Sequence, residues 1–426
     1  MATSFGINNT FLTPDVIARE ALLILENNIV APQVMSTSAT AEYTGAKVGD
    51  TIRIRRPAFF GVDEFARTDG GSEVVKIQDA KETSVNLVIE KLFDVSFEVT
   101  TKELALAVDD FNDRLLRPAM SALSQKIDQY ALTKVANLGG LADGATTTYA
   151  APDDLESIAK IVQKMNEQKI PMQNRKLLVS PAMQTALYKI DAFVRADIRG
   201  GGFTSPVDEA NLGRFMGMDT IMSQVLPQHT VGDMVSGNLA DRTGAINNSG
   251  GYTEGTTTIA VDGLGAPGDA TQNTVAVGDT VRITYADGIA RDHIVTAEAT
   301  NAGGAIAALN IFPGLYGTTG ATAVNQGTPA VVANDAVIVF LGENTKATYT
   351  MGAAFHPGAF QLVFVPQPNP MGPGTSSSTV NYNGMSLRVL QTYDHEKKRD
   401  LISVDCLVGA AAVDGRLGVR VPSTGG

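Results

Sequence analysis

The chain has 426 residues, and single hydrophobic cores stop growing at roughly 250–300 residues, so two or three folded units are expected. It carries 33 basic and 45 acidic residues, a net charge of −12, which argues against a protein that coats nucleic acid. No run approaches the ~18–20 apolar residues of a membrane span, and the N-terminus lacks the pattern of a signal peptide.

The first 50 residues are predicted to be an N-terminal arm with one short helix. Residues 1–12 form the loose part of this arm. The helix is predicted over 15–25, because Thr13 and Pro14 match an N-cap followed by proline at the first helical position.

A strand pair with a long tip is predicted next. Isoleucine alternates with arginine in Thr51 to Pro57, and apolar residues alternate from Val85 to Ile89 and, after a register shift, from Phe93 to Val99. A period of two indicates half-buried strands. The 58–82 connection is too long for a hairpin turn, so we expect this extended arm to pack on a neighbouring subunit.

A long helix is predicted over 101–137. Pro118 is expected to kink it or to start a second segment, and Gly139-Gly140 to end it. The predicted apolar face consists of Leu104, Val108, Phe111, Leu115, Leu123, Ile127, Tyr130 and Val135. The opposite face, interpreted as solvated or in contact with another copy, carries Asp109, Asp110, Asp113, Arg114, Arg117, Lys126 and Asp128.

An α/β alternation follows. A helix is predicted over 153–169, with the carboxylates of Asp153 and Asp154 capping its N-terminus. A strand over 176–180 and a helix over 181–190 come next, and Gly200 to Gly202 mark a flexible loop.

The segment 229–345 has a different composition. It contains no lysine, and its 3 arginines against 11 acidic residues give it a charge of −8. Short strands separated by turn residues predict a small all-β sandwich or barrel inserted into an α+β protein. The predicted strands are 256–261, 280–285, 293–297, 305–311 and 336–341.

The α+β pattern resumes after residue 345. Strands are predicted over 362–365, 385–390, 401–407 and 417–421, and the Pro/Gly/Ser-rich stretch 366–379 is predicted to be a loop. The single cysteine, Cys406, lies in one of these apolar runs and is predicted to be a small core residue.

No motif supports catalysis, a cofactor or a metal. Gly263 to Gly268 matches G-x-G-x-x-G, but Pro267 interrupts it and a strand rather than a helix is expected to follow. The four histidines lack metal-ligand spacing and are predicted to have surface or packing roles. We therefore predict a protein that is not an enzyme.

The order of these parts, together with local phrases, resembles the tailed-phage major capsid proteins of the Hong Kong 97 fold. Asn211 to Asp219 is similar to the family's strand leading into its central domain. Ala353 to Phe360 is similar to the family phrase AFHPDAF, with Gly358 in place of the usual acid. Met385 to Val389 and Val404 to Ala410 are similar to its closing strands. The insertion narrows the resemblance to coat proteins of short-tailed phages with a β-barrel insertion domain.

The resemblance implies a division of the chain and a set of contacts between subunits. The implied parts are an N-terminal arm (1–50), an extended loop (51–100), a spine helix (101–140), peripheral and axial regions (141–228 and 346–426) and the inserted barrel (229–345). The residues expected at contacts between subunits are Arg53, Arg55, Arg56, Glu64, Arg67, Lys76, Asp241 and Arg242. Lysine–asparagine cross-linking through Lys76 or Lys81 is not expected, because relatives with an insertion generally do not cross-link.

The implied function is self-assembly, as pentamers and hexamers, into an icosahedral phage head around double-stranded DNA. The expected partners are other copies, a scaffolding protein, a portal protein, a decoration protein and the packaged DNA without specific binding. Assembly is expected in the host cytoplasm and the final location in the virion, with no membrane. The alternative is a bacterial nanocompartment shell, which usually lacks the insertion. A tail or surface-layer component and a nicotinamide-dependent oxidoreductase are the more remote alternatives.

Overall fold

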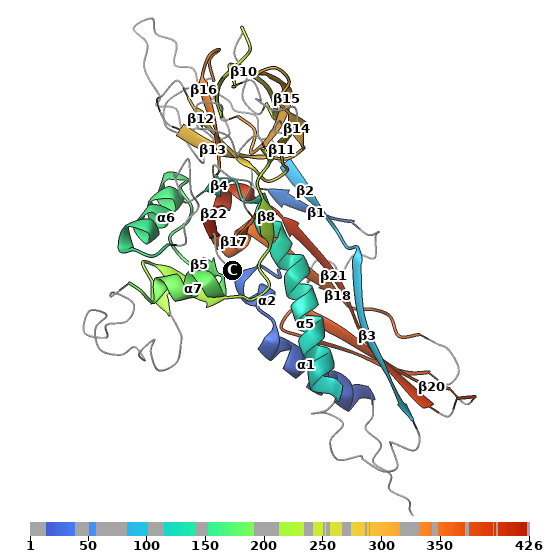
Figure 1. The fold of residues 1–426 in the computed structure, drawn as a ribbon. Coiled ribbons are helices and arrows are strands. Elements are labelled where there is room, and N and C mark those ends of the chain that lie inside the picture. Colours follow the sequence, from blue (N-terminus) through green and yellow to red (C-terminus); the bar gives the residue numbers. More distant parts are fainter. Residues whose placement is uncertain are drawn as a thin grey trace, which may run out of the picture. The chain divides into compact units, whose positions relative to one another are not determined.

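The computed structural model describes residues 14–38, 51–56, 83–100, 115–141, 152–190, 213–233, 242–249, 252, 256–265, 274–285, 288, 290–315, 332–342, 348–370, 375–394, 396–397 and 399–423. The chain forms two compact units, shown with the element labels in Figure 1. The first consists of Met1–Ile54, Asn86–Ala131 and Phe360–Ala411, and the second of Arg55–Val85, Leu132–Ala359 and Ala412–Gly426.

The first unit is built on a five-stranded sheet. Its order is β18-β21-β20-β19, and β3 pairs with residues 399–408 of β21, on the edge opposite to β20. The bounds are β3 Lys91–Thr100, β18 Phe360–Val365, β19 Thr375–Tyr382, β20 Met385–Asp394 and β21 Arg399–Ala412. Side chains alternate along β3, where Phe93, Val95 and Phe97 are half-buried and the residues between them are exposed. The predicted period of two is confirmed for this strand.

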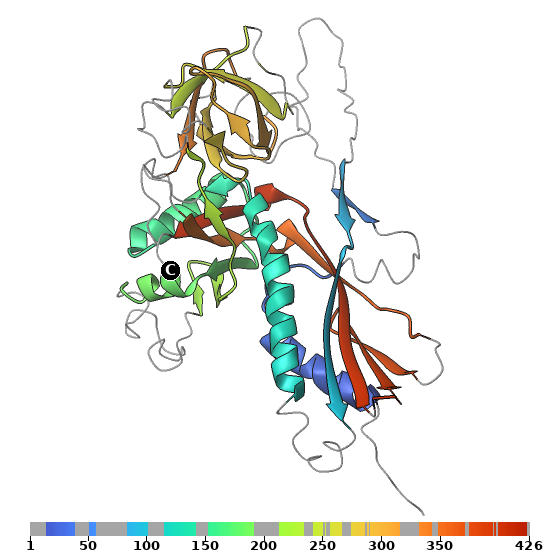
Figure 2. The same cartoon turned by 45° about the vertical axis from the view of Figure 1, so that its right-hand side comes forward.

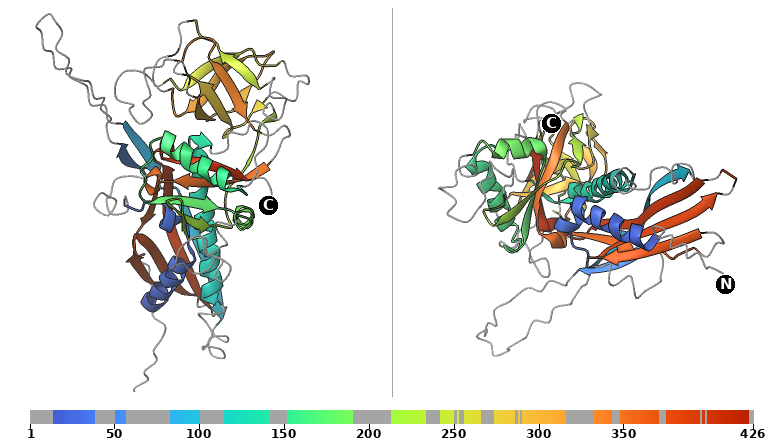
Figure 3. Two further views of the ribbon diagram at one scale, coloured as in Figure 1. Left: turned by 90° about the vertical axis from the view of Figure 1, so that its left-hand side faces the viewer. Right: turned by 90° about the horizontal axis from the view of Figure 1, so that it is seen from below.

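Two helices pack on this sheet (Figure 3). Helix α1 (Pro14–Asn28) lies against β19 and β20 and buries Ile17, Leu22 and Leu25. Helix α5 (Arg117–Leu132) contacts β3, where the rings of Tyr130 and Phe93 meet edge to face. A four-residue helix, α2 (Ala31–Val34), follows α1.

The strand pair predicted after residue 51 is confirmed as a two-stranded ribbon of β1 (Thr51–Arg56) and β2 (Thr83–Val88). Ile52 and Ile54 on one side pack with the buried Leu87 and Ile89. At the predicted register shift, residues 89–90 interrupt the strand, and the chain then enters β3. The division between the two units falls inside this ribbon.

The second unit contains a mixed sheet and a closed barrel (Figure 2). The sheet has the order β4-β22-β17-β5-β7-β6, with β8 paired to β17. Its strands are β4 Gly140–Leu141, β5 Arg175–Val179, β6 Arg214–Phe215, β7 Met218–Met222, β8 Gln228–Thr230, β17 Thr348–Phe355 and β22 Gly418–Ser423. Helices α6 (Leu155–Glu167) and α7 (Pro181–Leu187) share a hydrophobic core with it. The predicted α/β alternation is confirmed here.

The barrel is closed by six described strands in the order β10-β15-β13-β12-β16-β9. Their bounds are β9 Thr243–Ile246, β10 Thr258–Asp262, β12 Thr280–Thr284, β13 Ala290–Val295, β15 Ile306–Phe312 and β16 Val337–Leu341. A small separate pair, β11 (Thr274–Val275) and β14 (Ala299–Thr300), accompanies them. The five predicted strands are present, whereas β9, β11 and β14 were missed because two to four residues are too few for a periodic signal.

Three predictions need correction. The stretch predicted as a loop, 366–379, contains the start of β19, whose hydroxyl-rich residues pair with β20 along eight positions. Asp128 is buried rather than solvated. The long helix ends at Leu132 and continues as a 3-10 turn (Thr133–Asn137), while Gly140 belongs to strand β4.

The first part of the predicted long helix, 101–114, lies outside the described residues. Helix α5 (Arg117–Leu132) follows two π-helical residues, 115–116, and Pro118 lies in its first turn. Leu116 is buried in place of the predicted Leu115. No helix in the described part of the chain is long and apolar enough to cross a membrane.

Candidate assembly surfaces

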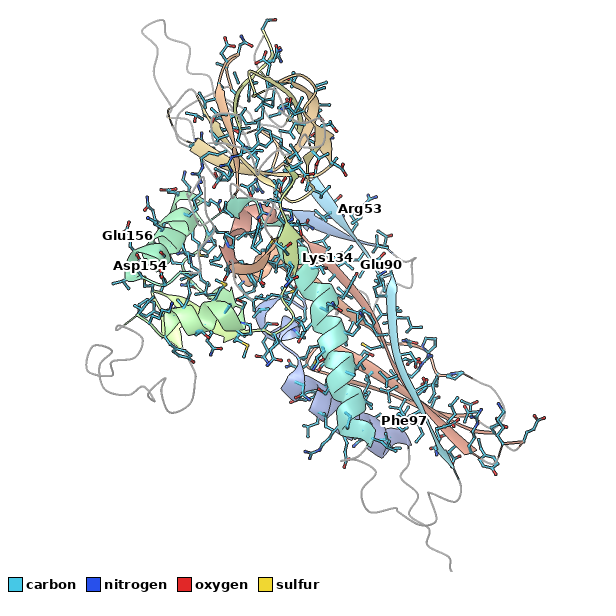
Figure 4. All side chains as sticks on the ribbon, viewed as in Figure 1. Arg53, Glu90, Phe97, Lys134, Asp154 and Glu156 are labelled. Atoms are coloured by element: carbon cyan, nitrogen blue, oxygen red, sulfur yellow. The ribbon has the colours of Figure 1, made fainter. Side chains whose placement is uncertain are left out.

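The ribbon β1–β2 has one packed side and one exposed side. Ile52 and Ile54 face the cluster of Leu87, Val363 and Val365. The alternation of the strand therefore places Arg53 and Arg55 on the opposite side, where both are exposed, and Figure 4 labels Arg53 there. Two arginines on an exposed strand form a basic surface with extended, adaptable side chains.

Charged pairs also cross the sheet of the first unit. Arg388 on β20 makes a two-point contact with Asp405 on β21, and Arg399 pairs with Glu98 across β21 and β3. These pairs join neighbouring strands within the chain. Arg388 and Asp405 face each other and Arg399 and Glu98 are diagonal neighbours, and opposite charges in both arrangements add cross-strand stabilisation to the sheet.

Buried polar contacts join the barrel to the sheet of the second unit. The carboxylate of Asp279, at the start of β12, is fully buried and lies 2.9 Å from His229 Nε2 on β8. It also accepts hydrogen bonds from the backbone N–H groups of Gly232 (3.1 Å) and Ala276 (2.8 Å). This carboxylate thus satisfies donors from both sides of the junction, as a buried charge requires.

Arg420 on β22 reaches the same turn of the barrel. Its guanidinium is buried, and it donates to the carbonyl of Gly278 at 2.6 Å and to the hydroxyl of Thr280. The hydrophobic core of the barrel also includes Tyr349 and Met351 of β17. The barrel and the sheet are therefore joined by continuous packing rather than by a flexible tether.

A second buried contact connects the barrel to helix α6. Asp292 on β13 accepts from Lys164 Nζ at 3.0 Å and from Arg282 Nε at 2.7 Å. Burial alone would raise the pKa of Asp292, but the charges of Lys164 and Arg282 outweigh burial and lower this pKa. Asp292 therefore stays ionised and holds two strands of the barrel to the helix.

The predicted packing roles of His229, His293 and Cys406 are confirmed. Burial lowers the pKa of His293 to about 4, so its ring is neutral at pH 7. Nδ1 then donates to the carbonyl of Pro313 at 2.7 Å, and Nε2 accepts from the Tyr285 hydroxyl at 3.1 Å. Burial raises the pKa of the Cys406 thiol, which donates to the Ser386 carbonyl.

Of the residues predicted at subunit contacts, the structure brings Arg53, Arg55 and Arg56 together on β1, although the side chain of Arg56 lies outside the described part. Glu64, Arg67, Lys76 and Asp241 also lie outside it. Arg242 is fully buried, and its Nη1 donates to the carbonyl of Gly342 at 2.7 Å. Its guanidinium therefore has a partner within its own chain, and its contact with another subunit stays a prediction.

Sequence reasoning missed Asp128, Asp279 and Asp292 as structural carboxylates. The sequence offered only their positions: Asp279 directly precedes the apolar strand β12, Asp292 lies within β13, and Asp128 shares the buried side of α5 with Ser124. Within the described residues, no group of three or more His, Cys, Asp or Glu side chains could hold a metal ion. Residues 266–273, which include the end of this glycine motif and the residues directly after it, lie outside the described part of the chain, so the predicted strand after the motif stays a prediction.

Comparison with known proteins gives distant structural similarities. No protein-family model and no curated protein matches the chain. The chain is similar to a solved structure of Mycobacterium phage Che8, with 11% identity, a TM-score of 0.46 and coverage of 92% of this chain and 90% of that one. It is also similar to the capsid of Ralstonia phage GP4, with 8% identity, a TM-score of 0.44 and coverage of 88% of this chain and 83% of that one. The mature capsid of bacteriophage PhiM1 is similar as well, with 11% identity, a TM-score of 0.41 and coverage of 88% of this chain and 82% of that one.

Proposed function

We propose that the chain is the major capsid protein of a tailed bacteriophage, with the Hong Kong 97 fold and the barrel as an inserted domain. The observation that best supports this is the order of parts along the chain. The ribbon β1–β2 runs into β3, helix α5 follows, and the barrel lies between the sheet strands β8 and β17. The resemblance in sequence implies the same order.

Assembly into pentamers and hexamers follows from this proposal. Head-to-tail contacts between identical subunits close into rings when the rotation between neighbours fits, and rings can then join into a closed shell. The ribbon is suited to such contacts, because its exposed side projects arginines and its backbone edges can add to another sheet. The net charge of −12 suits a shell that contains DNA without binding it tightly.

The proposed partners are other copies of the chain, a scaffolding protein, a portal protein and a decoration protein. The role is structural rather than enzymatic, with assembly in the host cytoplasm and a final place in the virion. A nanocompartment shell is the alternative, and the closed barrel between β9 and β16 argues against it, because such shells usually lack an insertion.

Expression of the chain alone, followed by electron microscopy and sedimentation, tests the proposal. Hollow shells, tubes or capsomer rings are the expected products. If the chain remains a homogeneous monomer even when the neighbouring phage genes are co-expressed, the capsid proposal is wrong. Deletion of residues 58–82 is expected to leave a folded subunit that cannot close shells, and normal particles from this deletion would contradict the role of the extended arm.

A further inference from the structure

Strand β19 forms an edge of the sheet in the first unit. β19 (Thr375–Tyr382) lies at the end of the order β18-β21-β20-β19 and pairs with β20 at all eight of its positions. Within the described part of the chain, none of its residues makes a backbone hydrogen bond outside that pairing. Every second residue of such a strand points its N–H and C=O away from its partner, so about half of the backbone groups of β19 face outward.

The side chains on both faces of this edge are engaged within the same unit. On the face that α1 covers, the Ser378 hydroxyl donates to Asp15 Oδ1 at 3.2 Å. On the other face, the Thr379 hydroxyl lies 2.9 Å from Asn369 Oδ1. Successive side chains of a strand point to opposite faces, so these contacts hold the strand from above and below and leave its backbone edge open.

β19 also lacks the features that keep the edge strands of monomeric proteins from pairing with other chains. Such edges are commonly protected by charged side chains, proline, bulges or a covering segment. The sequence of β19 contains no charge and no proline, and its register with β20 is unbroken. The other outer strands of this sheet differ, because β3 carries Lys91, Asp94 and Glu98, and β18 is bridged by Ser36. The unprotected edge of β19 indicates that a further strand pairs with it.

The sequence of β19 favours a second copy of itself as that strand. Because β19 has no charge, two copies meet without like charges, and Ser and Thr hydroxyls at facing positions can hydrogen-bond to each other. Strand β3 of another copy is a poorer match, because β19 offers no cation to Asp94 and Glu98.

We propose that β19 pairs antiparallel with β19 of a second copy about a two-fold axis, so that the sheets of two subunits become one. This contact does not depend on the capsid function. In a capsid it would join one ring to the next, since a two-fold contact is of a different kind from the head-to-tail contacts that close a ring.

The symmetry of this pairing fixes which residues meet. The axis is perpendicular to the sheet, so side chains of the same face meet and the axis passes through one residue, which faces its own copy. For the two strands to overlap along most of their length, this residue has to be near Ser378 or Thr379, in the middle of β19.

A cysteine scan of the full chain tests the contact. The native Cys406 is buried and should not react, and the single substitutions are Ser377→Cys, Ser378→Cys, Thr379→Cys and Val380→Cys. Oxidation of the purified protein is expected to link two copies at one of these positions and not at the next. The reason is that one step along antiparallel strands moves the two Cα atoms about 7 Å apart, which is too far for a disulfide. Ala122→Cys, on the exposed side of α5, is the control and should give no linked dimer.

A second variant protects the edge with charge. Ser376→Lys/Ser377→Lys places a lysine on each face of β19, and each lysine occurs twice about the axis. The subunit concentration needed for association should therefore rise about tenfold. Ala122→Lys/Gln125→Lys adds the same charge to exposed positions of α5 and should associate like the wild type. Circular dichroism first establishes that each variant is folded.

The outcomes separate this inference from the proposed function. If the wild type forms shells and no cysteine of β19 links two copies, the contact is wrong while the capsid function stands. Equal linking at all four positions and at Ala122→Cys would also overturn the contact, because it would show random collision. Weakened association of the lysine variant without any β19 disulfide would mean that a different strand occupies the edge. Dimers linked through β19 in a protein that never forms rings or shells would support the contact and overturn the capsid function.

Discussion

At the scale of single residues, the buried carboxylate of Asp128 is the most consequential. It is 3% exposed and accepts hydrogen bonds from the backbone N–H groups of Val30 (3.0 Å) and Ala31 (2.8 Å), at the start of α2. Burial raises the pKa of Asp128 to about 6, and the two backbone donors only partly oppose this rise. Asp128 thus connects the N-terminal segment to helix α5, although burial disfavours its ionised form.

The pKa of Asp128 predicts a pH dependence of stability. The folded carboxyl holds its proton more tightly than the unfolded one, whose pKa is near 3.8, so the free energy of unfolding falls as pH rises from about 4 to about 6. Asp128→Asn removes this titration, and the variant should gain about 2 kcal/mol relative to the wild type between pH 4 and pH 7. Urea unfolding at each pH measures the difference.

The uncharged substitution Ser124→Ala, on the same buried side of α5, is the control for Asp128→Asn. The free energy of unfolding of Ser124→Ala should differ from that of the wild type by the same amount across this pH range. If the free energies of unfolding of the wild type and Asp128→Asn change with pH in parallel, the Asp128 carboxyl does not titrate between pH 4 and pH 7.

A second prediction concerns Asp292. Asp292→Asn leaves Lys164 and Arg282 without their shared buried counter-ion, so the free energy of unfolding should fall by about 3–5 kcal/mol. Chemical denaturation measures the loss. Glu156→Gln breaks the exposed Glu156–Lys160 pair on the same helix and should change stability little. Equal effects of the two substitutions would contradict the role given to Asp292.

At the scale of elements, short polar residues at helix starts explain why the α/β region was predictable. Asp154 accepts from Ser157 N at 2.6 Å as the N-cap of α6, in agreement with its predicted role. The end of strand β5, Leu177 to Val179, is buried on both faces, so its short apolar run was recognisable. By contrast, β19 consists mainly of Ser and Thr, and only its pairing with β20 makes it a strand.

The cap of α7 gives a prediction for a single element. Ser180 is buried, and its hydroxyl accepts from Met183 N at 3.2 Å, directly before Pro181. Ser180→Ala leaves this N–H without its partner and should lower the free energy of unfolding by about 1 kcal/mol. The exposed Thr185→Ala in the same helix is the control and should have a smaller effect. A Ser180→Ala variant as stable as the control would show that the cap contributes nothing.

At the scale of the whole molecule, the second unit combines the barrel and the mixed sheet. Asp279→Ala removes the acceptor for His229, Gly232 N and Ala276 N at their junction. Amide hydrogen exchange should then increase in β12 and β13 of the barrel and also in β8 and β17 of the sheet, because the buried donors on both sides lose their partner. Faster exchange confined to the barrel would mean that the sheet does not depend on this contact.

The sequence by itself determined the period-two strands, the capped helices and the compositionally distinct barrel segment, because these depend on neighbouring residues along the chain. Arg53 and Arg55 could be placed on an exposed face for the same reason. The structure decided which carboxylates are buried, because both donors for Asp128 and the His229 and Gly232 donors for Asp279 come from residues about 50 to 100 positions away. It also decided that Asp262 and Val337 share one face of the barrel, since strand pairing and not sequence distance brings them together.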